Sequence, residues 1–372
     1  MLIGQTGIRL LLLVGETVPL PAPYALTSAV TRIQVTSDAE GGDGFQMTVK
    51  VARDAVLDYS VIAAGHLDPF KRIVVAVLFG VVPEVLIDGV VTNQQFTPSD
   101  EPGGSTLTVT GKDVSQMLDL EERNDEFPNQ PDALIATRRI AEYAQYGLVP
   151  AVTPTTDVPI QLQRVPRQAE TDLALLRRMA QRNGFVFYVE PLLPGVSTAY
   201  WGPENRLGLP QPALTLGMGA AANVKGLHFT QDGMGPVGTK GSFLEPVTGA
   251  ALPIPPLPPL KVPPLAAIPF TPRRTRILRE TAQANPAQAA LTAVSTATRA
   301  PDLVSAQGEV DTVKYGHALR ARKLVGVRGV GWSYDGLYYV RQVSHTITPG
   351  EYKQSFTLSR DGTGSTVPAV LP

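Results

Sequence analysis

The chain reads Asp88-Gly89-Val-Val-Thr-Asn-Gln-Gln-Phe96-Thr-Pro98, then Gly103-Gly104, then Thr106-Leu-Thr-Val-Thr110-Gly-Lys-Asp113. Near its C-terminus it reads Asp335-Gly336-Leu-Tyr-Tyr-Val-Arg-Gln-Val-Ser-His-Thr-Ile-Thr348-Pro349-Gly350, then Ser355-Phe-Thr-Leu-Ser359-Arg-Asp361. Each stretch runs from Asp-Gly through a strand-like segment, a Thr-Pro and glycine turn, and an alternating segment to a closing Asp. Asp-Gly favours a hairpin turn because both residues tolerate positive φ, and alternation of apolar and polar residues is typical of a half-buried strand. The repeat predicts two related β-domains with turns at Gly89 and Gly336; the alternative is two unrelated hairpins that look alike.

Composition supports a β-rich protein of several domains. A chain of 372 residues suits two to four domains, and 34 Gly plus 34 Pro with only 17% charged residues fits strands joined by turns and extended segments. So few charges also indicate a surface that packs against other subunits. The formal net charge of −1 gives no basic excess, so we expect no nucleic-acid binding. The absence of cysteine excludes disulfides, thiolate metal sites and a cysteine nucleophile.

The N-terminal apolar run is too short to cross a membrane. It spans Ile8-Arg-Leu-Leu-Leu-Leu-Val14 and is interrupted by Arg9, without the basic lead and small-residue cleavage site of a signal peptide. It is interpreted as a strand or an intersubunit arm, and no stable membrane insertion is expected.

Strand-like and helix-like patterns alternate along the rest of the chain. Short β-like segments at 31–36, 45–51 and 72–79 predict a barrel or sandwich. The acidic stretch 121–132 is interpreted as a connector. Helical spacing with capping residues then predicts helices at 133–146 and 171–183, and an aromatic, β-branched strand at 185–189 follows; together they indicate a small α+β domain. Further strands are expected at 213–216 and 224–230.

The segment 252–272 is dense in proline. It predicts a stiff, polyproline-like spacer or a loop lying on a neighbour, with an SH3 ligand as the alternative. Helices are expected after it, over 280–298 and 311–322.

No catalytic group of residues stands out. The four histidines, His66, His228, His317 and His345, show no metal-ligand spacing, and His345 is expected at the surface or an interface. The acidic residues of 121–126 lack the glycine and terminal glutamate of a calcium loop. We therefore predict neither enzymatic activity nor a cofactor, a metal or a catalytic residue.

Longer motifs resemble a known family. The segment Arg167-Gln-Ala-Glu170-Thr-Asp172-Leu-Ala-Leu-Leu176-Arg-Arg-Met-Ala-Gln-Arg-Asn-Gly184-Phe-Val-Phe-Tyr188 is similar to a signature of the phage late control protein D family, the tail hubs that include the N-terminal part of VgrG. The segments Tyr200-Trp-Gly-Pro-Glu-Asn-Arg206 and Leu324–Gly329, with the C-terminal half of the repeat, are similar too. The resemblance runs from about Leu10 to Gly362.

The resemblance implies a homotrimer at the tip of a contractile tail, in which two tube-like β-barrels per chain form a pseudo-six-fold ring between a three-fold spike and a six-fold inner tube. The expected domains are an N-terminal arm (1–28), a first tube-like barrel (29–125), an α+β domain (126–200), a β segment packing on the first domains (201–250), a proline-rich segment with an alanine-rich helix (251–300) and a second tube-like barrel (301–372). Seven side chains are expected at tube or ring interfaces: Phe96, Leu107, Val109, Tyr338, Val340, Phe356 and Leu358.

Partners follow from the same resemblance. VgrG continues into a needle, whereas this chain reads no further than Pro372, so the spike is expected on a separate chain. The inner tube protein and other baseplate proteins complete the expected partners of a hub made in the cytoplasm, which becomes part of a phage tail or injection particle. The rival hypotheses are a tail-associated cell-wall-degrading enzyme and a carbohydrate-binding adhesin.

Overall fold

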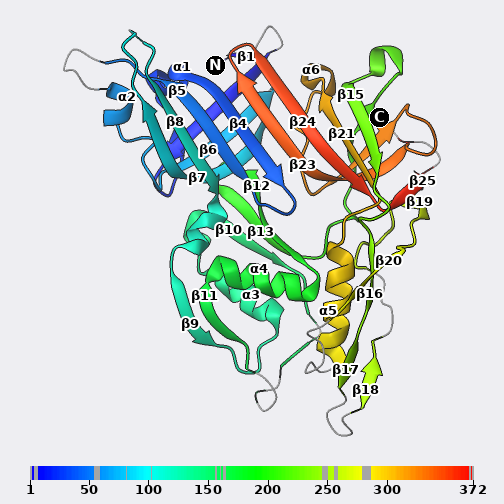
Figure 1. Cartoon of the computed structure of the whole chain (residues 1–372). Coiled ribbons are helices and arrows are strands. Elements are labelled where there is room, and N and C mark those ends of the chain that lie inside the picture. Colours follow the sequence, from blue (N-terminus) through cyan, green and yellow to red (C-terminus); the bar gives the residue numbers. More distant parts are fainter. Residues whose placement is uncertain are drawn as a thin grey trace.

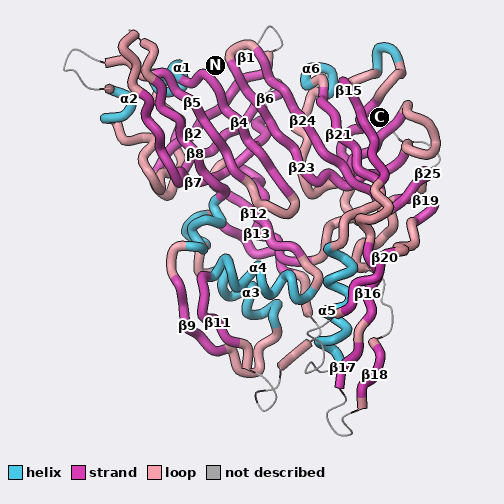
Figure 2. Tube along the Cα trace, viewed as in Figure 1, coloured by secondary structure: helices cyan, strands magenta, loops and turns pink. Residues whose placement is uncertain are grey.

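The computed structural model describes residues 2–3, 7–53, 59–80, 82–101, 103–155, 157–159, 161, 165–244, 250–254, 259–278, 286–367 and 370. Strands dominate, and helices are concentrated below two strand-built lobes that lie side by side (Figures 1 and 2). The predicted fold class, mainly β with an α+β insert, is confirmed.

The first lobe is an antiparallel sheet that curls around one core. Its strands, in spatial order, are β2 (Ile8–Gly15), β6 (Arg72–Phe79), β7 (Val82–Thr97), β8 (Thr106–Asp113), β5 (Gly44–Lys50) and β4 (Val30–Asp38), with β1 (Leu2–Ile3) and β3 (Leu20–Pro21) beside β2. Two short helices, α1 (Tyr24–Ala29) and α2 (Ser60–Ala63), connect them. Side chains from all six main strands share one apolar cluster, so the sheet closes over it as a barrel wall does.

The second lobe repeats this arrangement. Its strands, in spatial order, are β14 (Gln211–Thr215), β22 (Leu324–Arg328), β23 (Gly336–Thr348), β24 (Glu351–Arg360), β21 (Val304–Val310) and β15 (Val224–Gln231), with α6 (Thr312–Tyr315) between β21 and β22. They enclose a second apolar cluster of their own. The short strand β25 (Gly362–Ser365) pairs instead with β19 (Ala266–Pro269).

A small α+β unit lies beneath the first lobe (Figure 1). Helices α3 (Asp132–Ala141) and α4 (Asp172–Asn183) pack on a sheet of β10 (Leu148–Val152), β13 (Val196–Gly202) and β12 (Val186–Leu193). Helix α4 begins where the Thr171 hydroxyl accepts a hydrogen bond from the amide of Ala174, and it ends at Gly184 with φ of 69°. These caps confirm the helix predicted at 171–183. The fully buried Trp201 donates its indole N–H to the carbonyl of Leu176 at 3.0 Å, which fixes the sheet to α4.

A smaller unit lies beneath the second lobe. It combines α5 (Pro286–Arg299) with β16 (Val237–Lys240), β17 (Ser242–Leu244), β18 (Ala251–Pro253) and β20 (Arg274–Ile277). The proline-rich tract begins here with β18, and its later part lies on the second lobe, where Leu265 packs beside Leu324 and Tyr339. The tract is held by its own chain: Lys261 Nζ donates to the carbonyl of Ala300 at 2.6 Å and to Asp302 at 2.9 Å. Residues 255–258 of the tract and 280–285 of the predicted alanine-rich helix lie outside the described residues.

Four predictions about local structure need correction. The acidic stretch 121–132 is more than a connector, because it contains strand β9 (Glu122–Glu126), which pairs with β11 (Arg167–Thr171). The helix expected over 133–146 ends at Ala141, and the helix expected over 311–322 is only α6. Residues expected to form an arm include β2, which pairs with β6 along seven residues and belongs to the first lobe.

Candidate interaction site

The two lobes meet at a hydrogen-bonded strand junction. Strand β4 of the first lobe pairs antiparallel with β23 of the second, from Ile33 opposite Ile347 to Asp38 opposite Gln342. The hydroxyl oxygens of Thr36 and Ser344 lie 3.4 Å apart across this pair. The junction therefore fuses both lobes into one sheet within a single chain.

The second lobe also completes the core of the first. Ala318, Ile347 and Tyr352 belong to the first lobe's apolar cluster although they come from the second lobe. His345 lies beside them and is 2% exposed, with Nδ1 2.9 Å from the hydroxyl oxygen of Tyr352. The prediction that His345 lies at the surface or an interface with another chain was wrong. Burial, assisted by the nearby charge of Arg320, lowers the pKa of His345 to about 3, so the ring is neutral at pH 7.

A buried ion pair, Arg322 with Asp43, joins the two lobes beside this strand pair. The guanidinium of Arg322, from the second lobe, contacts both carboxylate oxygens of Asp43 in the first lobe, and it also donates to the carbonyl of Asp38 at 2.6 Å. Both side chains are at most 5% exposed. Burial raises the pKa of Asp43, and the guanidinium of Arg322 opposes that shift. Removal of the arginine would leave a buried carboxylate without its cation, with only the amide of Asp38 still donating to it, so this pair makes the lobes depend on one another.

A second charge cluster joins the second lobe to the segment that follows the α+β unit. Arg341 donates to Glu204 at 2.6 Å and to Asp302 at 3.2 Å, and Asp302 also accepts from Lys261. Although burial disfavours its charged form, the cations Lys261, Arg341 and Arg206 hold the pKa of Asp302 well below its usual range. The cluster is therefore charged and paired at neutral pH.

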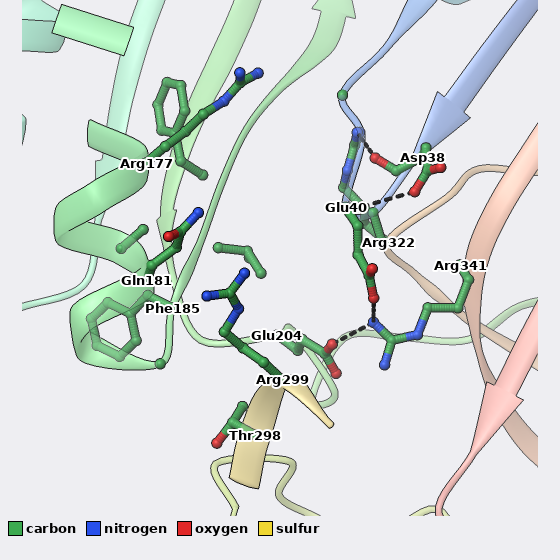
Figure 3. A pocket seen from close by; sticks show the side chains of 16 residues that line it. Asp38, Glu40, Arg177, Gln181, Phe185, Glu204, Thr298, Arg299, Arg322 and Arg341 are labelled. Carbon is green, nitrogen blue, oxygen red and sulfur yellow. Dashed lines mark hydrogen bonds and ion pairs between the residues drawn. The ribbon is translucent and has the colours of Figure 1, made fainter. Parts of the chain in front are cut away.

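A polar cleft of about 180 Å³ opens where the lobes, α4 and α5 converge (Figure 3). On one side, Arg341 faces the carboxylates of Glu40 and Glu204, and Arg322 donates to the backbone carbonyl of Asp38. On the other side, Arg177 from α4 and Arg299 from α5 are exposed, and neither makes an ion pair within the described part of the chain. The cleft carries charge without any nucleophile positioned beside a base.

The two lobes have the same strand order, and five of the six strands run in the same relative directions. The first strand differs, because β14 is parallel to β22 whereas β2 is antiparallel to β6. One row of residues that lie opposite each other runs Val91–Gly111–Phe45–Val35 across β7, β8, β5 and β4, and the equivalent row runs Val340–Leu358–Ala306–Phe229 across β23, β24, β21 and β15. A second row runs Phe96–Leu107–Val49–Val30 in the first lobe and His345–Gln354–Val310–Val224 in the second. Both β7 and β23 also bulge one residue after the first row, at Thr92 and Arg341.

An unusual backbone conformation occurs at the same point of each lobe. Phe70 and Arg322 adopt left-handed φ values of 68° and 63°, which side chains other than glycine rarely take. The amide of Phe70 donates to the carbonyl of Val91, and the amide of Arg322 donates to the carbonyl of Val340, both at 2.8 Å. The shared strand order, bulge and strained residue show that the repeat extends through five antiparallel strands of each lobe, β6, β7, β8, β5 and β4 in the first and β22, β23, β24, β21 and β15 in the second.

The Asp-Gly pairs that first indicated the repeat are not equivalent. Gly89 lies opposite Ile73 as Tyr338 lies opposite Val325, so the counterpart of Gly89 is Tyr338. Gly89 is in the middle of β7, and the prediction of a turn there was wrong. A Cβ at Gly89 would lie 2.5 Å from the carbonyl oxygen of Lys112 and 3.0 Å from the ring of Phe45, so glycine is needed there for space. Gly336, with φ of 127°, begins β23 directly after a turn.

The seven expected interface residues fall into two groups. Phe96 is 39% exposed near the end of β7. The other six are buried within the chain's own lobes and build their cores: Leu107, Val109, Tyr338, Val340, Phe356 and Leu358. Of the seven, Phe96 is therefore the one whose side chain is exposed on the surface of the chain.

Within the described residues, no three potential ligands gather closely enough to hold a metal ion. No helix of that part of the chain is both long and apolar enough to cross a lipid bilayer.

No protein-family model and no curated protein matches the sequence, whereas solved structures match the fold along nearly the whole chain. A tail protein from Neisseria meningitidis superposes with a TM-score of 0.61 at 14% identity, covering 95% of this chain and 97% of that one. The 43 kDa tail protein of prophage MuSo2 from Shewanella oneidensis gives 0.60 at 16% identity, covering 96% and 99%. An E. coli component of the type VI secretion system, described as structurally similar to the T4 tail proteins gp27 and gp5, gives 0.56 at 14% identity, covering 92% and 77%. The chain thus has the fold of phage tail and hub-like proteins, which confirms the resemblance at the level of fold.

Proposed function

We propose that the chain is a structural baseplate hub of a contractile phage tail or contractile injection system. In this proposal three copies form a ring of six lobes that adapts a three-fold spike to a six-fold inner tube. The chain acts mechanically: it nucleates the tube on one face of the ring, seats the spike on the other and anchors neighbouring baseplate proteins.

The observation that carries this proposal is the pair of lobes with the same strand order, joined edge to edge in one sheet. A six-fold partner needs six similar surfaces, and a chain with two such lobes supplies them from three copies. The junction of β4 with β23 already sets one lobe beside the next with a defined register.

The comparisons support the same conclusion through the fold of tail proteins. A chain in a structure of the Francisella PdpA–VgrG complex also shares the fold, with a TM-score of 0.56 at 8% identity, and this chain spans about half of that one. The hub is expected to be made in the cytoplasm and to leave it, if at all, within a particle.

The native mass of the purified chain tests this function, measured alone and with a co-expressed spike candidate. A species of three times 39.7 kDa whose images show six similar lobes is the expected result. A monomer under both conditions, across micromolar concentrations, would overturn the proposal.

A non-enzymatic role is part of the proposal and has its own test. The purified chain should not clear a suspension of bacterial cell walls. Clearing would instead support the tail-associated enzyme.

A further inference from the structure

Strand β15 is the second-lobe counterpart of β4, but it lacks the neighbour that β4 has. In β4, Ile33 and Val35 are fully buried because β23 covers the outer edge of the strand. In β15, the corresponding Leu227 and Phe229 are only half-buried. Within the described part of the chain, β15 pairs with β21 alone, so its outer edge is open.

The outer half of β7 is the first-lobe counterpart of the β23 segment that covers β4. From Asn93 to Thr97, β7 pairs with β8 on one side only, among the described residues, and its side chains are largely exposed. The equivalent residues of β23 include Val343 and His345, which are at most 2% exposed because β4 lies beside them. The two open edges thus lie on the two strands that correspond to the closed junction.

The two segments that correspond to the closed junction carry no charged residue and no proline; Lys225 and the irregular register between Lys225 and His228 lie toward the other end of β15. Free strand edges in natural sheets commonly bear charged side chains or proline, which discourage another strand from adding. The segments Asn93-Gln-Gln-Phe-Thr97 and Leu227-His-Phe-Thr-Gln231 contain neither Lys, Arg, Asp or Glu nor proline. Figure 1 places β15 and the β7–β8 hairpin at opposite ends of the upper layer, so one chain cannot pair them with each other.

We infer that β15 of one copy pairs antiparallel with Asn93–Thr97 of the next copy, repeating between chains the junction that β4 and β23 make within a chain. This inference rests on the proposed function and names its ring contact. The register of the inferred pair is obtained by replacing each residue of the β4–β23 junction with its equivalent in the other lobe. His345 faces Val35 in the closed junction, so Phe96 faces Phe229 in the open one. Ser344 faces Thr36, so Gln95 faces Thr230.

The contact has a physical rationale on both sides. Phe96 is an exposed aromatic side chain, and Phe229 already stacks on Tyr334 with ring centroids 4.6 Å apart at the rim of the second core. Burial of Phe96 against Phe229 removes apolar surface from water and forms a cross-strand aromatic pair. The head-to-tail contact uses different surfaces on the two copies, so it forms a ring when its rotation closes.

Disulfide trapping tests the register. The chain has no cysteine, so the double variant Gln95→Cys/Thr230→Cys introduces only the two thiols of interest. Directly opposed residues of an antiparallel pair have the Cα separation that a disulfide needs. Mild oxidation should convert the chain to covalent trimers that a reductant reverses. The matched positive control, Thr36→Cys/Ser344→Cys, should instead form a disulfide within each monomer, because these side chains already meet across the closed junction.

The outcomes separate this inference from the proposed function. A native trimer that closes the control disulfide but not the Gln95–Thr230 disulfide would overturn the inferred contact and leave the hub standing. The absence of any trimer, with or without the spike candidate, would overturn both. Covalent ladders beyond three copies would confirm the strand pairing and overturn the three-copy ring.

A second variant keeps the inference testable if the cysteine variant folds poorly. Phe96→Lys places a charge in the inferred contact, so the midpoint concentration for trimer dissociation should rise at least about tenfold. Val82→Lys is the matched control: Val82 is 70% exposed on the same strand but outside the contact, and its substitution should leave the midpoint unchanged. Equal midpoints for the two variants would overturn the contact.

Discussion

The two lobes share a backbone plan but use equivalent positions differently. At the strained left-handed position, the second lobe has Arg322, buried against Asp43, whereas the first lobe has Phe70, which is 58% exposed. At the bulge, the second lobe has Arg341, paired with Glu204, whereas the first has the exposed Thr92. The difference shows that lobes with a common strand order can use equivalent positions for different purposes: in the second lobe, Arg322 holds the two lobes together.

The largest expected effect on stability comes from removing the buried ion pair between Arg322 and Asp43. Arg322→Ala should reduce the free energy of unfolding by about 3–5 kcal/mol, because Asp43 would remain buried without its cation. The backbone stays equally strained, since alanine tolerates left-handed φ no better than arginine does. Urea unfolding of the isolated chain measures the change.

The equivalent substitution in the first lobe is the control. Phe70→Ala keeps the same backbone and removes no buried ion pair, so its effect should remain below about 1 kcal/mol. Equal losses for the two variants would show that the backbone position, not the ion pair, makes Arg322 important.

The second prediction concerns the pH dependence of folding stability. It rests on His345, which can bind a proton, whereas its first-lobe counterpart Phe96 cannot. The pKa of His345 is about 3 in the folded chain and about 6.5 in the unfolded chain. Between these values the unfolded state binds more protons, so the stability that neutral His345 provides is present above pH 6.5 and is lost as the pH falls toward 3. Between pH 7.5 and 4.5 this should remove about 2–3 kcal/mol.

A neutral variant isolates this contribution from the carboxylates that titrate over the same range. His345→Gln can still hydrogen-bond to Tyr352 and carries no titrating group, so its unfolding free energy should fall less steeply with acid. Parallel pH profiles for the two proteins would show that His345 is not protonated on unfolding.

The third prediction tests how the two cores reach similar packing with different residues. In the first lobe, the large Phe45 lies over Gly89 and Gly111; at the equivalent positions the second lobe has Ala306, Tyr338 and Leu358. Gly89→Ala should reduce stability by about 1–3 kcal/mol, because the new methyl group would overlap the Lys112 carbonyl and crowd the Phe45 ring.

Two further variants test whether the loss of stability comes from crowding at Gly89. Thr92→Ala, on the same strand but exposed, should change stability by no more than about 0.5 kcal/mol. In a Phe45→Ala background the penalty of Gly89→Ala should shrink, since the ring that crowds the site is gone. An undiminished penalty would assign the whole effect to the strand backbone.

The sequence reveals the repeat but points to the wrong residues for its register. Two Asp-Gly pairs look equivalent because turn motifs are short and common. The true correspondence is between Val30-Thr-Arg-Ile-Gln-Val-Thr-Ser-Asp38 and Val224-Lys-Gly-Leu-His-Phe-Thr-Gln-Asp232, which share the valine, the alternating apolar residues, the threonine and the aspartate. The insertion between β15 and β21 hides it, because it separates strands that are consecutive in the first lobe.

Local signals predicted local structure well, and tertiary partners account for the failures. Helix α4 has both caps in its own sequence and was predicted almost to the residue. Strand β9 has the acidic composition of a loop. It is a strand because β11 pairs with it and because arginines from elsewhere in the chain, such as Arg139 beside Asp125, stabilise its carboxylates. Arg322 and Asp43, the ion pair between the lobes, are 279 residues apart in the sequence. No rule of sequence spacing could have predicted that they meet.

The smallest expected effect is at Phe70, the residue of the first lobe with a left-handed φ. Unlike Arg322, its second-lobe counterpart, Phe70 makes no buried ion pair that would offset the backbone strain. Phe70→Gly should increase the free energy of unfolding by about 0.5–1 kcal/mol, because glycine adopts the left-handed φ of 68° freely and the exposed ring contributes little burial. The gain is limited by the greater freedom of glycine in the unfolded chain. The same change at Arg322 should be strongly destabilising, since the lost ion pair outweighs the relieved strain. Opposite signs at two positions with one backbone conformation would show that the lobes differ through side chains; a loss at Phe70 would mean that its ring, too, packs against a neighbour.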